Sequence, residues 1–181
     1  MNRLSIPFVS IVAVLAPLSG ASALEYPIGE PQLINGMEIA AVYLQPIEME
    51  PVHIMKPAVD SDIHLEADIH ATQDNANGFA EGDWIPNLTI EYTLTKLDDN
   101  DWTGGVFMPM VASDGPHYGD NVKLMGPGKY RLVYKIASVA PGAASHFGRH
   151  VDKETGVGAW PGTFTVEYEF TYAGTGKKGG Y

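Results

Sequence analysis

Histidines and carboxylates alternate with apolar residues in the segment 62–70, which reads DIHLEADIH. If this segment is a β-strand, its apolar residues face a core, and the opposite face carries Asp62, His64, Glu66, Asp68 and His70. Side chains two residues apart on one strand face are separated by about 6–7 Å. His64 and Glu66 are therefore close enough to bind one metal ion. A solvated outer strand face would show the same alternation, and this segment alone does not separate the two interpretations.

A second group of possible metal ligands lies in the segment 108–117, which reads MPMVASDGPH. Alternation places Met108 and Met110 on the same face of a strand, and the Asp-Gly-Pro turn that follows brings His117 back near the end of that strand. A thioether beside an imidazole suits copper or another late first-row metal. Methionine pairs also fill hydrophobic cores, so a structural role for both methionines stays open.

The third group is SHFGRHVD at 145–152, in a connection punctuated by Gly and Pro. Loops on a rigid scaffold often carry binding residues. His146 and His150 can bind the same ion only if the loop is helical there, and otherwise one of them is a surface histidine.

Composition narrows the classes of function. The chain has 181 residues, with 22 acidic and 11 basic side chains, a formal net charge of −11 and no cysteine. The acidic balance argues against a nucleic-acid partner and is compatible with attracting cations. The lack of cysteine excludes disulfides, Cys-based zinc sites and blue-copper centres. The motifs of serine hydrolases, zinc proteases and phosphate-binding loops do not occur, so the sequence predicts a binding protein and not an enzyme.

Short stretches of alternating polarity are separated by turn residues, and the clearest are 37–44, 62–71, 88–97, 106–112, 130–136 and 164–172. Many short strands in a chain of this length predict an all-β fold, an antiparallel β-sandwich of the immunoglobulin-like or cupredoxin-like kind.

The first 23 residues have the features of a secretory signal peptide. Arg3 supplies the positive charge, 6–18 is an apolar stretch, and Ala21-Ser22-Ala23 forms a cleavage signal. The segment 1–23 is therefore expected to be removed on export, and 24–181 is expected to form a single metal-binding β-sandwich domain.

Four long stretches resemble a known family. They are 35–47 (NGMEIAAVYLQPI), 62–71 (DIHLEADIHA), 108–119 (MPMVASDGPHYG) and 147–158 (FGRHVDKETGVG). Together they resemble the periplasmic high-affinity ferrous-iron transport proteins of bacteria, which have an immunoglobulin/cupredoxin-like fold. The likeness extends from about residue 29 to residue 172 of the chain.

The resemblance implies a homodimer in the periplasm that binds Fe²⁺ and Cu²⁺ and works beside an inner-membrane iron permease. Mn²⁺ or Zn²⁺ would serve as surrogates. The family's copper site carries over onto His64, Met110, His117 and His150, and Glu66 corresponds to a nearby or alternative metal position. His70 and His146 do not belong to that set.

Three other functions remain open at this point: a periplasmic copper or zinc carrier, a structural sandwich module whose histidines are incidental, and an oxidase that converts Fe²⁺ to Fe³⁺ during transfer. Because histidine binds metal only when neutral, we also expect metal binding to weaken as the pH falls through roughly 6–6.5.

Overall fold

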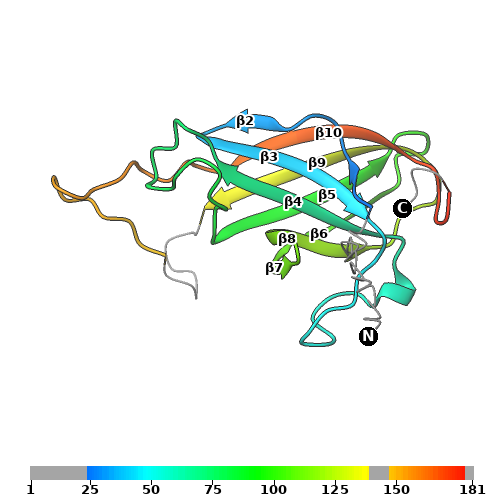
Figure 1. Cartoon of the computed structure of the whole chain (residues 1–181). Helices are drawn as coiled ribbons and strands as arrows, with labels where there is room; N and C mark the ends of the chain where they lie inside the picture. The colour runs from blue at the N-terminus through cyan, green and yellow to red at the C-terminus, as the bar shows by residue number, and fades with distance from the viewer. Residues whose placement is uncertain (1–23, 139–146, 178–181) are drawn as a thin grey trace, which may run out of the picture.

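Two antiparallel β-sheets lie face to face in the computed structural model, which describes residues 24–138 and 147–177 (Figure 1). The six-stranded sheet has the order β1-β3-β4-β8-β7, with β2 paired to β3. Its strands are β1 (Tyr26–Pro27), β2 (Gln32–Ile34), β3 (Met37–Leu44), β4 (Ile63–Ala71), β7 (Met108–Ala112) and β8 (Gly115–Val122). The four-stranded sheet has the order β10-β9-β5-β6 and consists of β5 (Leu88–Lys96), β6 (Trp102–Val106), β9 (Gly128–Ser138) and β10 (Phe164–Tyr172).

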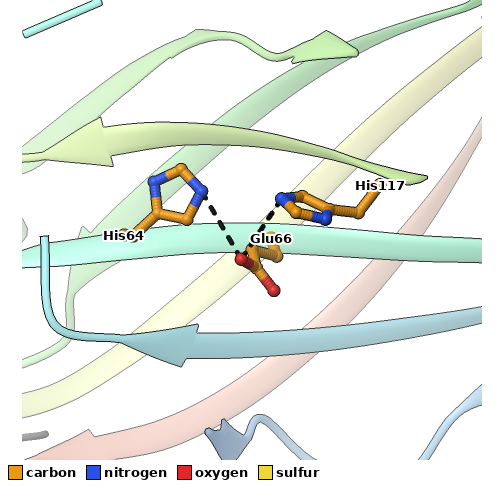
Figure 2. A group of neighbouring side chains, drawn as sticks. All are labelled: His64, Glu66 and His117. Atoms are coloured by element: carbon orange, nitrogen blue, oxygen red, sulfur yellow. Dashed lines mark ion pairs between the residues drawn. The ribbon is translucent and has the colours of Figure 1, made fainter. Parts of the chain in front are cut away.

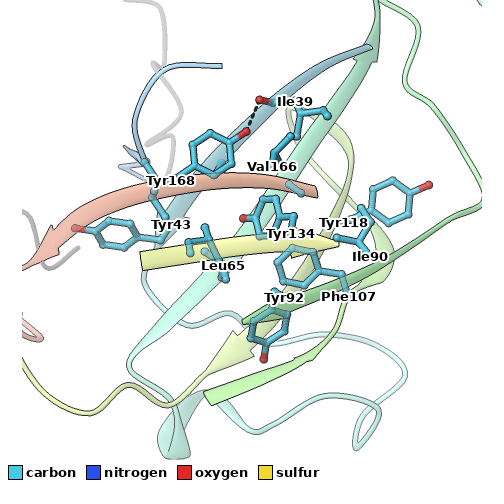
Figure 3. Packing of buried hydrophobic residues seen from close by; sticks show 14 of the residues in the cluster. Ile39, Tyr43, Leu65, Ile90, Tyr92, Phe107, Tyr118, Tyr134, Val166 and Tyr168 are labelled. Atoms are coloured by element: carbon cyan, nitrogen blue, oxygen red, sulfur yellow. Dashed lines mark hydrogen bonds between the residues drawn. The ribbon is translucent and has the colours of Figure 1, made fainter. Parts of the chain in front are cut away.

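The core lies between the sheets and is rich in tyrosine (Figure 3). Two buried tyrosines cross from one sheet to the other and donate to backbone carbonyls. The Tyr168 hydroxyl donates to the Ile39 carbonyl at 2.7 Å, and the Tyr134 hydroxyl donates to the Glu66 carbonyl at 2.8 Å. Each ring supplies apolar area while its hydroxyl stays hydrogen-bonded. These bonds fix β3 and β4 against the four-stranded sheet.

The predicted antiparallel β-sandwich is confirmed, and five of the six predicted strands correspond to single strands of the structure. The predicted strand 106–112 is wrong as a unit. Val106 ends β6 in one sheet and Met108 begins β7 in the other, with the buried Phe107 between them. Phe107 stacks on Tyr92 with ring centroids 4.8 Å apart. The chain changes sheets at this residue because the ring is anchored in the core between them.

Strand β8 was not predicted, because its sequence GPHYGDNV contains two glycines and a proline and lacks apolar alternation. It nevertheless lies inside the six-stranded sheet, paired on both sides with β4 and β7. The loop 45–62 joins β3 to β4 and contains one short 3₁₀ helix, η1 (Ala58–Asp60). The predicted signal peptide lies outside the described residues. Among the residues described, no helix combines the length and apolar character that crossing a membrane requires.

Candidate metal centre

The strand register brings four of the five predicted ligands, all except His150, to one place on the outer face of the six-stranded sheet. His64 and Glu66 lie on β4, and β8 pairs beside them with Asn121 opposite His64 and Gly119 opposite Glu66. His117 lies two residues before Gly119, so its side chain is on the same face.

Two of the predicted ligands, His64 and His117, point toward the carboxylate of a third, Glu66. The Nε2 atom of His64 lies 3.5 Å from Oε1 of Glu66, and Nε2 of His117 lies 3.3 Å from the same oxygen. Figure 2 shows both imidazole rings turning a nitrogen toward this carboxylate. Within the described residues, the three side chains form a group whose ligand atoms all lie within 4.8 Å of one another.

The cluster is buried, although the alternating pattern of β4 is also typical of an exposed face. His64 is 0% exposed, Glu66 6% and His117 5%. Neither Nε2 atom makes a hydrogen bond of acceptable geometry within the part of the chain that the structure describes. Buried polar atoms are normally hydrogen-bonded, and a group that lacks a partner marks a functional candidate. Two unpartnered imidazole nitrogens and a carboxyl group directed to one point are a metal-binding arrangement.

Burial keeps two members of the metal-free cluster, His64 and Glu66, neutral at pH 7. Desolvation lowers the pKa of His64 to about 4, against the opposing effect of its hydrogen bond to Asn121. Desolvation also raises the pKa of Glu66 to about 8, helped by the negative charges of Asp68, Glu25 and Asp114. At pH 7 His64 is therefore neutral and Glu66 is protonated, so their contact is not an ion pair.

Asn121 fixes the ring of His64. Its Nδ2 donates to the carbonyls of Ile47 at 2.8 Å and Lys56 at 2.9 Å, and its Oδ1 accepts from the Ile47 amide at 3.1 Å. The same Oδ1 lies 3.0 Å from Nδ1 of His64. Because this oxygen can only accept, Nδ1 carries the proton and Nε2 presents its lone pair to the cluster. An outer-shell partner of this kind commonly orients a metal-binding histidine.

Gly119 leaves the space that His64 occupies. A Cβ atom at this position would lie 2.7 Å from Nε2 and 3.1 Å from Cε1 of the ring. Such contacts are shorter than van der Waals packing allows, so any larger residue would displace the imidazole.

Met110 lies beside the cluster. It pairs with His117 across β7 and β8, whereas Met108 pairs with Gly119. Both methionines therefore share the cluster's face, as the alternation predicted. Met110 lines a cavity of about 500 Å³ together with Glu66 and His117, and Met108 does not. Directly paired residues on one face have Cβ atoms about 4.5–5.5 Å apart, which places the thioether within reach of a metal held by His117.

His150 is not part of the cluster within one chain. It lies on the segment 147–160, which extends away from the sandwich in Figure 1. Its side chain is 74% exposed, and its Nδ1 lies 2.7 Å from the hydroxyl of Thr155 and 3.8 Å from Asp152. The other histidine predicted in this region, His146, lies outside the described residues.

Asn121, Gly119 and the covering loop 45–62 were not identified from the sequence. Had 115–122 been recognised as a strand, alternation from His117 would have placed Gly119 and Asn121 on the ligand face. The loop carries no signal that it covers the cluster, since its contact with Asn121 spans 65 to 74 residues of sequence.

Curated proteins of similar sequence extend over nearly all of the chain. A UPF0423 protein of Brucella abortus (strain 2308) is 64% identical over 174 residues, which covers 93% of this chain and 96% of the relative. The 34 kDa membrane antigen of Treponema pallidum (strain Nichols) is 37% identical over 168 residues, which covers 88% of this chain and 80% of the relative.

Solved structures of the same architecture contain copper in several cases. The copper-reconstituted P19 protein from Campylobacter jejuni is 54% identical, with a TM-score of 0.80 over 84% of this chain and 99% of that one. FetP of uropathogenic Escherichia coli strain F11, expressed recombinantly in the periplasm, is 56% identical, with a TM-score of 0.78 over 83% of this chain and 97% of that one. The family described as Fe2+ transport protein matches residues 22–174. The resemblance seen in the sequence is thereby confirmed, and the chain belongs to the Fe²⁺ transport protein family.

Proposed function

We propose that this chain is a periplasmic metal-binding protein of an iron-uptake system, with Fe²⁺ and Cu²⁺ as the ions it carries. The observation that carries the proposal is the buried cluster of His64, Glu66 and His117, in which both Nε2 atoms lack a hydrogen bond and face one carboxylate. Met110, paired with His117, supplies the fourth donor from the same chain.

The donor set accepts more than one metal. Imidazole suits copper, iron and zinc, a carboxylate suits harder ions such as Mn²⁺, and a thioether favours copper. Cu²⁺ binds such a site more tightly than Fe²⁺ by the general order of divalent affinities. If iron is the physiological cargo, the availability of each metal, and not its affinity, must therefore determine which ion occupies the site. The copper-bound relatives support copper as a second ion.

We extend the proposal to His150 through a homodimer. Within one chain this exposed histidine does not join the cluster. A second copy whose segment 147–160 reaches the cluster would add a third imidazole and complete the predicted ligand set. Closed two-fold symmetry would then give two equivalent sites per dimer.

Mixing two variants tests this arrangement. His117→Ala and His150→Ala copies are each expected to lose high-affinity binding alone. If His150 acts on its partner's cluster, mixed dimers contain one intact site, and random exchange restores about a quarter of the sites. No recovery in a mixture shown to form mixed dimers would mean that His150 serves its own chain or no site.

The main test is a metal titration. The purified protein is titrated with Cu²⁺ and, without oxygen, with Fe²⁺ or Mn²⁺, beside a His117→Ala variant. We expect saturable binding that the variant loses. His70→Ala is the matched control, because His70 shares the face of β4 but lies opposite Glu38 and outside the cluster. Binding that is indifferent to His117 would refute the site and favour a structural module.

The iron permease partnership is tested in cells. A protein of an iron-uptake system with an inner-membrane permease should be needed for growth only when iron is scarce. Growth defects under copper or zinc stress, with normal growth under iron limitation, would favour the alternative of a copper or zinc carrier. We propose no catalytic activity, in keeping with a family described by transport.

A further inference from the structure

We propose a second, soft metal site in the loop that covers the cluster, where Met49, His53 and Met55 bind Cu⁺. This inference rests on the proposed function, in that it assigns a further ion to a metal-handling protein. The loop site differs from the buried centre in its residues, in its exposure and in the metal that its donors select.

The loop folds around a cavity of about 140 Å³ that is lined by its own residues alone, 47–49 and 51–58. A volume of this size exceeds what one water molecule needs, so it has room for an ion. Three of the lining side chains are metal donors, namely the thioethers of Met49 and Met55 and the imidazole of His53. Both methionines are half-buried, while His53 is exposed to solvent.

The donors select a soft ion. Glu48 is the one carboxylate among the lining residues of this cavity, which also include the cationic Lys56. Thioethers select Cu⁺, whereas Mn²⁺ and other hard divalent ions need oxygen ligands. The buried centre has a harder donor set, since it combines two imidazoles and the carboxylate of Glu66 with the single thioether of Met110. The two sites are therefore suited to different oxidation states or different metals.

Asn121 holds both ends of the loop. Its side chain hydrogen-bonds to the amide and carbonyl of Ile47 at one end and to the carbonyl of Lys56 at the other. The donor-bearing segment 48–55 is thus closed into a ring before any ion arrives, which reduces the entropy lost on binding. His53 has a φ of 68°, in the left-handed region that a residue with a Cβ seldom adopts. Backbone strain of this kind is concentrated at ligand-binding sites.

Met49 connects the two sites. It lines the loop cavity and also the larger cavity that contains Glu66, Met110 and His117. A Cu⁺ ion in the loop would therefore share one wall with the buried centre. The two sites would thus be neighbours, and an ion held by the soft ligands of the loop would lie beside the buried centre.

A Cu⁺ titration tests the inference. The purified protein is titrated with Cu⁺ without oxygen, in competition with a chromophoric Cu⁺ chelator. The test variant is His53→Ala/Met55→Leu, which changes two residues that line the loop cavity and not the larger one. Met125→Leu is the matched control, since this methionine packs against the core away from both cavities. Thermal unfolding followed by circular dichroism verifies that each variant is folded.

We expect the double variant to bind about one Cu⁺ fewer than the wild type, or to bind it at least about tenfold more weakly, and Met125→Leu to match the wild type. His117→Ala is expected to keep the loop ion while losing divalent binding at the buried centre. Equal Cu⁺ binding by the folded double variant and the wild type overturns the loop site. Loss of all Cu⁺ from His117→Ala also overturns it, whereas divalent binding unchanged in His117→Ala refutes the proposed function instead.

Discussion

Replacing Glu66 by glutamine should change the number of protons released when a divalent metal binds. Only the carboxylate form is a good metal ligand, so a protonated carboxyl must lose its proton on binding. Burial and the negative charges of Asp68, Glu25 and Asp114 raise the pKa of Glu66 to about 8. At pH 7, one unit below this pKa, about 0.9 of the molecules carry the proton. Metal binding then releases about 0.9 proton from this residue at pH 7 and about 0.1 at pH 9.

Affinity should follow the same titration. Between pH 7 and pH 9 the fraction of Glu66 ready to bind rises about tenfold, so the contribution of this residue lowers Kd about tenfold. His64 contributes little over this range, because burial holds its pKa at about 4. The expectation from sequence, that binding weakens as pH falls through roughly 6–6.5, assumed ordinary histidines. For His64 the structure moves protonation well below that range, and Glu66 adds a titration above it.

Isothermal titration calorimetry with Mn²⁺ or Zn²⁺ measures the protons directly. The binding enthalpy at pH 7 is plotted against the ionisation enthalpy of several buffers, and the slope is the number of protons released. Glu66→Gln should reduce the slope by about 0.9. Glu91→Gln is the matched control, because Glu91 is an exposed partner of Lys135 on the four-stranded sheet. An equal slope in wild type and Glu66→Gln would refute the conclusion that Glu66 is protonated in the metal-free protein.

Three further outcomes are expected. Asn121→Ala removes the acceptor for His64 Nδ1 and should weaken divalent binding about 10–100-fold, as measured by metal competition with a chelator. Asn121→Asp should recover part of this affinity. Unchanged affinity in Asn121→Ala would show that the His64 ring needs no such support. Gly119→Ala places a Cβ 2.7 Å from His64 Nε2 and should abolish binding while the β-sheet circular dichroism remains, so a variant with wild-type affinity would contradict the close packing. The metal-free protein should lose stability as pH rises from 6.5 to 8. The raised pKa of Glu66 contributes to the free energy of unfolding in full below its ordinary value of 4.5, and this contribution is lost as the pH rises through 8. The lowered pKa of His64 has the opposite sign. Its contribution is present in full above its ordinary value of 6.5 and is lost as the pH falls through 4. Of these two residues only Glu66 changes between pH 6.5 and 8, so its contribution to the free energy of unfolding should fall by about 2 kcal/mol across this range. Glu66→Gln should lose this part of the pH dependence in urea unfolding.

The sequence predicts the regular strands well, because alternation is a local property. The alternating residues of β4 and β10 show their two faces within nine residues each. Strand β8 does not show such alternation, because its place in the sheet is determined by pairing with β4 and β7 and not by its own composition. The break at Phe107 is missed for a related reason. The buried ring of Phe107 lies where the chain passes from one sheet to the other, and nothing in the local alternation indicates this change of sheet.

The predicted ligands on regular strands were easier to place from the sequence than the one in a connecting segment. Those on paired strands, His64, Glu66 and His117, lie together in the structure, and Met110 lies opposite His117. Alternation predicted that His64 and Glu66 share a face, and one tight turn predicted that His117 lies near Met110. That the two groups form one site was implied only by the resemblance to the family, because the pairing of β8 with β4 that joins them was not predicted. The place of His150 could not, because an exposed segment between strands has no register to fix it. Whether it completes the site stays a prediction that the mixing experiment tests.

Strand β4 faces a core on one side and a metal cluster on the other, and this limits how the gene can change. Deleting or inserting one codon between His64 and Glu66 would shift one part of the strand against the other by one residue and exchange the two faces of that part. One ligand would then turn into the core and an apolar side chain into the cluster, so folding and binding would fail together. Single substitutions at 64 or 66, by contrast, leave the core side chains in place. Lineages of this fold can therefore alter metal preference by exchanging donors one at a time, but length changes are confined to the loops.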